Sequence, residues 1–262
     1  MKLLKVKCDQ GNLKSRDGLA QAPNIIVKEL KEFFLGENGK NPVYEVDSIE
    51  QSGQGIEKTH ELIYEKAKSI LKQDELASVG GDHSITHPLF KAFSEKYDNV
   101  GLVYVDAHAD CEQGTSTPTY EDVLRKIISD GLVKPWNVIL IGIRNWTENE
   151  KIFIQQSKIK FFPMKDVASE GLEETIESAR YLLSRCDNVY ASFDIDAVDP
   201  AFAPGTGWQE PGGFTSREAI RIAQALGTLK KVKAFDLVEC KDHPATAKLC
   251  SKILFEFLAH KQ

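Results

Sequence analysis

The chain has 262 residues, of which 42% are hydrophobic and 27% are charged. This composition is typical of a globular protein and excludes a disordered chain and a membrane-embedded one. The formal net charge is −6, with lysines spread along the chain, so there is no basic stripe of the kind that nucleic-acid binding needs. No stretch approaches the roughly 18 apolar residues of a membrane span. We therefore expect a cytoplasmic protein without nucleic-acid or membrane partners.

Short β-rich runs alternate with amphipathic helical patterns along the whole chain. The expected strands are residues 3–8, 43–47, 76–80, 100–106, 138–143, 159–162, 189–194 and 232–238. The expected helices are residues 24–35, 56–73, 121–130, 172–185, 217–226 and 245–260. Near-continuous apolar strands such as residues 100–106 are typical of a parallel sheet covered by helices on both faces. The sequence has no internal repeat or linker. It therefore predicts a single three-layer α/β sandwich domain over residues 1–262, with a central, mostly parallel eight-stranded sheet.

The cysteines are five in number, widely spaced and without a CxxC pair. This pattern argues against a disulfide framework and against a zinc site. We expect reduced thiols, which agrees with a cytoplasmic chain.

Polar side chains cluster at three places where an apolar strand ends. The runs are Gly80-Gly81-Asp82-His83-Ser84, Asp106-Ala107-His108-Ala109-Asp110 and Asp194-Ile195-Asp196. In open α/β sheets, ligands bind in the crevice beyond the carboxyl ends of the strands. Alternate residues of an extended chain point to one side, so the side chains of each run can converge. The candidate ligands are His83, Asp106, His108, Asp110, Asp194 and Asp196.

This set of four carboxylates and two imidazoles favours a site for two divalent ions. Like charges held together out of water raise each other's pKa, and a cation relieves that cost. Four negative charges balance two divalent ions, and an oxygen-rich set without thiolates suits manganese. Two ions roughly 3.5–4 Å apart can generate hydroxide for a hydrolase. One motif alone could be structural, with Asp196 capping a turn, but three motifs at strand ends favour a metal site.

The three runs resemble, in the same order, those of the ureohydrolase family of arginases, agmatinases and related guanidino hydrolases. The third run extends this similarity through Ser192-Phe193-Asp194-Ile195-Asp196-Ala197-Val198-Asp199-Pro200. Residues 18–23 resemble the family's first helix entry, and residues 204–215 resemble its glycine-rich loop, which we expect to border the active site. The resemblance implies an arginase-like fold, two Mn²⁺ ions per chain, a small guanidino substrate, and a homo-trimer or homo-hexamer.

The resemblance also implies a role for each matching residue. One manganese would be bound by His83 and Asp110, the other by His108 and Asp196, and both by Asp106 and Asp194. Asp110 would in addition hand a proton to the departing amine. Glu239 matches the glutamate that holds the substrate guanidinium through two hydrogen bonds. An ion pair at the sheet edge is the structural alternative for Glu239.

One catalytic element of the family has no counterpart at its usual place. Arginases and agmatinases carry a proton-shuttling histidine in the loop after the second run, but residues 112–127 contain none. Tyr120 is the nearest replacement, although a phenol with a pKa of about 10 shuttles protons less well than an imidazole. His243 follows Glu239 closely enough to reach the pocket. We expect surface or capping roles for His60 and His87.

The substrate-binding segment also differs from that of arginases. Asn145 and Thr147 stand where arginases have aspartates, which disfavours recognition of free arginine. Trp146 either lines an apolar or cation-binding channel or packs in the core. We predict a binuclear manganese hydrolase that cleaves an agmatine-like or arginine-like guanidino compound to urea and an amine. The alternatives are a formiminoglutamate-type amidine hydrolase and a catalytically weak metal-binding member with a regulatory role.

Overall fold

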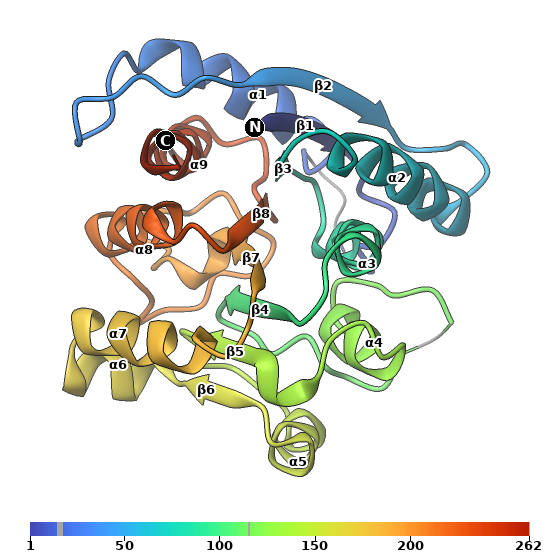
Figure 1. Ribbon diagram of the computed structural model, residues 1–262, viewed down its shortest axis with the longest axis vertical. Helices are drawn as coiled ribbons and strands as arrows, with labels where there is room; N and C mark the ends of the chain where they lie inside the picture. Colours follow the sequence, from blue (N-terminus) through green and yellow to red (C-terminus); the bar gives the residue numbers. More distant parts are fainter. Residues whose placement is uncertain (15–17, 115, 262) are drawn as a thin grey trace.

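The central element is a sheet in which every strand pair is parallel (Figure 1). The structure is a computed structural model that describes residues 1–14, 18–114 and 116–261. Its eight strands lie in the order β2-β1-β3-β8-β7-β4-β5-β6. They are β1 (Lys2–Lys7), β2 (Glu45–Glu50), β3 (Leu76–Val79), β4 (Val100–Val105), β5 (Val138–Ile141), β6 (Lys160–Phe162), β7 (Asn188–Asp194) and β8 (Val232–Val238). All eight expected strands are present.

Helices cover both faces of the sheet, which confirms the three-layer prediction. One face carries α1 (Ala22–Glu29), α6 (Met164–Glu170), α7 (Leu172–Leu183), α8 (Ser216–Thr228) and α9 (Pro244–His260). The other carries α2 (Ile56–Leu71), α3 (Thr86–Lys96), α4 (Val123–Ser129) and α5 (Glu148–Ser157). Each helical layer packs its own hydrophobic core against the sheet. None of the helices in the described residues has both the length and the apolar content that a membrane span requires.

The differences from the expected elements have local causes. Strand β2 begins two residues later than expected. Among the described residues it is an exposed edge strand that pairs with β1 alone, and it has no apolar run to mark it. Helices α3, α5 and α6 were not in the expected set. The exposed helix α5 buries little apolar surface, but Thr147 and Glu150 form a capping box at its start, which is a sequence signal for a helix.

The strand order brings distant segments of the chain together. Strands β3, β8, β7, β4 and β5 are consecutive neighbours in the sheet, although the chain visits them in a different order. Because all are parallel, their carboxyl ends lie along one edge of the sheet, where the three polar runs begin.

Candidate metal centre

All six candidate ligands meet beyond the carboxyl ends of β3, β4 and β7. His83 begins the 3-10 helix η2 (His83–Ile85) after β3, and the run that starts at Asp106 directly follows β4. Asp194 ends β7, and Asp196 lies in the 3-10 helix η4 (Ile195–Ala197). The carboxylates are almost fully buried, and His108 is half-buried.

The turn that presents His83 is fixed by close packing. A Cβ at Gly81 would lie 1.7 Å from Cys8 O, and one at Gly80 would lie 2.1 Å from Ile85 Cδ1. Neither glycine has a positive φ, so they are needed for close approach and not for a left-handed turn. Asp82 accepts hydrogen bonds from Ser84 N and Gly11 N at 3.0 and 2.9 Å.

The aspartates are oriented by backbone donors. His108 N donates to Asp106 Oδ1 at 2.7 Å, and Asp196 N donates to Asp194 Oδ1 at 2.8 Å. Asp110 has a φ of 49° and Glu239 a φ of 63°, a left-handed conformation that costs free energy in non-glycine residues and is enriched at functional sites.

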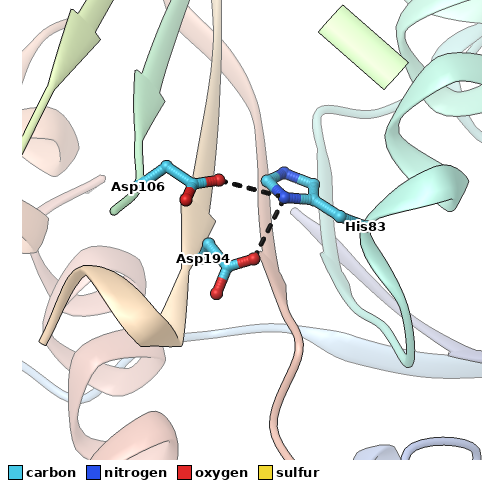
Figure 2. Close-up of side chains that lie close together, drawn as sticks. All are labelled: His83, Asp106 and Asp194. Carbon is cyan, nitrogen blue, oxygen red and sulfur yellow. Dashed lines mark ion pairs between the residues drawn. The ribbon is translucent and has the colours of Figure 1, made fainter. Parts of the chain in front are cut away.

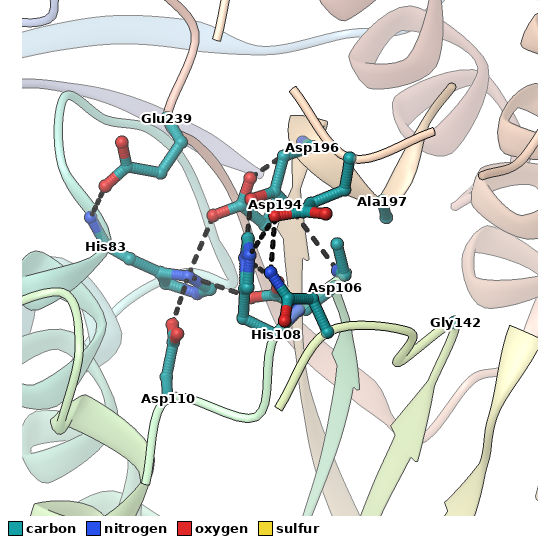
Figure 3. A network of polar contacts seen from close by, with 12 residues as sticks. His83, Asp106, His108, Asp110, Gly142, Asp194, Asp196, Ala197 and Glu239 are labelled. Carbon is teal, nitrogen blue, oxygen red and sulfur yellow. Dashed lines mark hydrogen bonds and ion pairs between the residues drawn. The ribbon is translucent and has the colours of Figure 1, made fainter. Parts of the chain in front are cut away.

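Three carboxylates converge on one ring nitrogen of His83. The Nδ1 atom lies 3.2 Å from Asp106 Oδ2, 3.1 Å from Asp110 Oδ2 and 3.1 Å from Asp194 Oδ2 (Figures 2 and 3). A single Nδ1 can donate at most one proton. It therefore cannot satisfy three carboxylates at once.

A second group surrounds His108 (Figure 3). Its Nδ1 lies 2.9 Å from Asp196 Oδ2 and 3.7 Å from Asp106 Oδ1, and its Nε2 lies 3.2 Å from Glu210 Oε1. His83, Asp106 and Asp194 form one constellation whose ligand atoms lie within 4.8 Å of one another, and Asp106, His108 and Asp196 form another. The two groups share Asp106.

The buried charges perturb one another strongly. Burial, together with the neighbouring aspartates, raises the pKa of Asp106 well above its usual value. Burial and Asp196 raise the pKa of Asp194 to about 7. Burial opposes the charged form of His108, but Asp196 and Asp106 outweigh it and raise its pKa to about 11. Without a cation, the cluster therefore holds protons that metal ligands must release.

These residues fit a metal. Asp106 Oδ2 is buried and has no hydrogen-bond partner among the described residues, although it lies beside His83. A divalent cation between the carboxylates and imidazoles would satisfy this oxygen and relieve the repulsion. The donors are oxygens and imidazole nitrogens only, a set that suits manganese and related ions.

A buried network supports His83 on its far side. Its Nε2 lies 2.9 Å from Ser192 Oγ, which donates to Asp236 Oδ1 at 2.5 Å. Asp236 Oδ2 accepts from Tyr190 at 2.6 Å and from Thr86 at 2.8 Å. Such outer partners fix the ring orientation of a metal-binding histidine.

A cavity of about 410 Å³ opens onto both groups. Its lining comes from loops that follow β3, β4, β5, β7 and β8. The lining residues are His83, His108, Asp110, Glu112, Gln113, Tyr120, Glu121, Asn145, Trp146, Thr147, Glu150, Asp194, Asp196, Trp208 and Glu239.

Three of the four remaining candidate residues line this cavity. Glu239 is buried, and its Oε1 accepts from His83 N at 2.7 Å (Figure 3). Tyr120 donates its hydroxyl to Glu121 at 2.8 Å, and burial raises the pKa of its phenol. Trp146 is half-buried and packs edge-on against Phe161 with ring centroids 5.3 Å apart.

The fourth candidate, His243, is not among the described residues that line the cavity. It is the N-cap of α9, where its ring accepts from Thr246 N at 3.5 Å. The expected surface or capping roles of two other histidines are met only in part. His87 pairs with Asp130 at 2.9 Å, but His60 is buried against Ser84 at 3.1 Å, because its helix face turns inward.

The sequence analysis missed several residues at this site. Trp208 lines the cavity, and Glu210 contacts both His108 and Asn145. Both lie in the loop of residues 204–213, which was expected at the site without individual roles. Tyr104 was read as one residue of an apolar strand. Its place two residues before Asp106, on the same strand face, was the available signal.

Arg144 joins two of the loops around the site. Its Nη2 donates to Asp196 O and to Glu210 O, both at 2.6 Å. It therefore holds the loop after β5 against the segment after β7.

The fold and the site together define a class of protein. A parallel three-layer α/β fold, with histidines and aspartates grouped at the carboxyl ends of its central strands, is the arrangement in which α/β enzymes hold metal ions.

Comparisons with known proteins identify the family. The arginase family model matches residues 1–260. An arginase of Staphylococcus aureus is 32% identical over 242 residues, which cover 82% of this chain and 80% of the relative. A guanidinopropionase of Pseudomonas aeruginosa is 33% identical over 233 residues, which cover 86% of this chain and 69% of the relative. Formimidoylglutamase from Bacillus subtilis matches the fold with a TM-score of 0.94 at 22% identity, covering 99% of this chain and 86% of that one. The chain belongs to the arginase family and is a hydrolase of C–N bonds in linear amidines.

Proposed function

We propose that this chain is a binuclear manganese hydrolase that cleaves a guanidino compound with a cationic tail into urea and an amine. The observation that carries the proposal is the pair of His and Asp groups that share Asp106 and open, with Glu239, into one cavity. Family membership supports the reaction class, and the cavity supports the choice of substrate.

The ion next to His83 would be held by that residue and Asp110, and the ion next to His108 by that residue and Asp196. Asp106 and Asp194 lie against both groups. When bound, such ions supply Lewis-acid chemistry that makes water nucleophilic near neutral pH.

Glu239 provides a carboxylate for the guanidinium. A planar guanidinium pairs with a carboxylate through two parallel hydrogen bonds, and the pairing is strongest away from water. The backbone N–H of His83 holds one oxygen of Glu239 in place at 2.7 Å. The substrate carbon is thereby kept beside the metal groups.

Asp110 lines the cavity, and its proposed role is to move a proton. Addition of water to the guanidinium carbon releases a proton, and cleavage of the C–N bond requires one on the departing nitrogen. The Asp110 carboxylate would accept the first and deliver the second. Tyr120 is the better placed of the two proposed shuttle residues, because it lines the cavity and His243 does not. Burial raises its pKa, so the phenol stays protonated near neutral pH and can donate a hydrogen bond, but it releases its proton less readily than a free phenol.

The outer part of the cavity favours an amine tail. No lysine or arginine is among the described residues that line the cavity, whereas the carboxylates Glu112 and Glu121 are. Trp146 and Trp208 add aromatic faces, which attract cations. An agmatine-like substrate, with a guanidinium at one end and an ammonium at the other, matches this lining.

One observation favours a second candidate, a formiminoglutamate-type amidine hydrolase. The ammonium of Lys14 lies 3.2 Å from the centre of the Trp208 ring, so a cation stands beside a residue that lines the cavity. A substrate carboxylate could pair with it. Attack on an amidine carbon would then release formamide in place of urea.

The test is turnover by the full chain loaded with Mn²⁺, on agmatine, arginine, 3-guanidinopropionate and formiminoglutamate. We expect urea from agmatine at a kcat/KM at least tenfold above that from arginine. Formamide from formiminoglutamate, with no urea from the guanidines, would select the second candidate. Full metal occupancy without any turnover would reject both and support a regulatory role.

The resemblance further implies a homo-trimer or homo-hexamer, and we propose that assembly for this chain. Light scattering of the metal-loaded protein checks it, and a monomer at micromolar concentration would reject it.

A further inference from the structure

Tyr104 places a hydroxyl group inside the ligand cluster. It lies in β4, is fully buried, and shares a strand face with Asp106, two residues later. Its hydroxyl donates to Asp110 Oδ2 at 2.6 Å. Its ring stacks on the imidazole of His83, with centroids 4.6 Å apart and planes 3° apart.

The stacking leaves His83 able to bind a cation. The Tyr104 oxygen lies 3.1 Å from His83 Nδ1, but in stacked parallel rings it faces the imidazole and does not lie in its plane. The lone pair of a ring nitrogen points along the plane. Because the phenol has one proton and Asp110 accepts it, Tyr104 does not compete for the lone pair of Nδ1.

Asp110 needs such a partner. Its backbone has a left-handed φ of 49°, and its carbonyl accepts a hydrogen bond from Leu124 N at 3.0 Å. These features fix its main chain but leave its carboxylate free to rotate. The bond from Tyr104 to Oδ2 removes that freedom, and a short bond to a carboxylate in a buried place is a strong one.

We propose that Tyr104 is a positioning residue that orients Asp110 and His83 together for the ion bound between them. It does not act as a proton shuttle, because it is fully buried and is not among the described residues that line the cavity. Its hydroxyl donates to one candidate ligand and its ring stacks on another, so its contacts go beyond filling the core. The effect on metal binding rests on the metal site of the proposed function, and the effect on turnover rests in addition on its proposed reaction.

The main test is Tyr104→Phe in the full chain, which removes one oxygen and keeps the ring stack. Ser251→Ala is the matched control. Ser251 lies in α9, and its buried hydroxyl donates to Ile26 O of α1 at 2.7 Å, so this variant also deletes a buried hydroxyl. Mn²⁺ affinity is measured by electron paramagnetic resonance of the free ion during titration, and metal-free stability by thermal unfolding.

We expect Tyr104→Phe to weaken binding of one of the two ions about tenfold or more, as loss of an outer partner does elsewhere. Ser251→Ala should leave both affinities unchanged, and both variants should fold. With the best substrate, Tyr104→Phe should lower kcat about tenfold and change KM less than twofold.

A double-mutant cycle assigns the route of the effect. In an Asp110→Asn background, Tyr104→Phe should change Mn²⁺ affinity less than twofold, because the partner carboxylate is already lost. Unchanged Mn²⁺ affinity in the single variant would overturn the proposal, as would an equal effect in both backgrounds. Failure of Tyr104→Phe to fold while Ser251→Ala folds would assign the tyrosine to the core and overturn it as well. Metal binding without turnover would reject the proposed function alone.

Discussion

Glu239→Gln isolates the charge that we propose holds the guanidinium. The amide keeps the size of the side chain. Its oxygen can still accept the hydrogen bond that His83 N donates to Glu239 Oε1 at 2.7 Å in the native protein. What is lost is a charge-assisted pair. Hydrogen bonds to charged groups contribute about 1.5–3 kcal/mol, and the burial of Glu239 favours the upper half of that range. A loss of about 2–3 kcal/mol corresponds to a roughly 30- to 150-fold fall in kcat/KM.

The assay is urea release by the Mn²⁺-loaded variant over a range of agmatine concentrations. If Glu239 binds substrate and transition state alike, most of the loss will be a rise in KM. Glu256→Gln is the control, because Glu256 is a fully buried carboxylate in α9 that pairs with Lys252 at 2.5 Å. It should lower stability without changing kcat/KM. A fall of less than threefold for Glu239→Gln, at full metal occupancy, would refute the assigned role.

Three further predictions concern protonation, proton transfer and packing. The folded-state pKa of Asp194 is raised from 3.8 to about 7 and that of His108 from 6.5 to about 11. Each group therefore stabilises the metal-free fold fully at a pH below its unfolded pKa, and this contribution is lost as the pH rises toward the folded-state pKa. The gain in thermal midpoint on adding Mn²⁺ should therefore widen between pH 6 and pH 8, and a constant gain would contradict this. Tyr120→Phe should lower kcat about tenfold, whereas His243→Ala should lower the thermal midpoint and leave kcat unchanged; the opposite result, from steady-state kinetics, would exchange their roles. Gly81→Ala should destabilise the fold by about 3 kcal/mol, because the new Cβ would lie 1.7 Å from a backbone oxygen; denaturant unfolding with no change would show that the turn can relax.

Much of the fold follows from local sequence patterns. The buried strands β4 and β5 are apolar almost throughout, so their alternation with helices predicts a parallel sheet. The edge strand β2 and the short helix α6 bury little, so their patterns are weak and their bounds were misplaced or missed. Strand order was not available from the sequence, because it depends on long-range pairing.

The convergence of the candidate ligands could be predicted because each follows a strand at regular spacing. The residues around them could not. Tyr104 looks like any core aromatic, and only its distance to Asp110 distinguishes it. His243 is close to Glu239 in the chain, but the start of α9 uses its ring as a cap. Sequence proximity does not tell which way a side chain points.

The sheet order also separates the residues proposed for the chemistry from those proposed to select the substrate. The candidate ligands and Glu239 follow or end the four adjacent strands β3, β8, β7 and β4. Asn145 and Trp146 follow β5, and Trp208 lies in a long loop after η4. Changes in the outer loops can alter the tail that fits without moving a ligand. A family with this layout can acquire new substrates by loop substitution while its reaction stays the same.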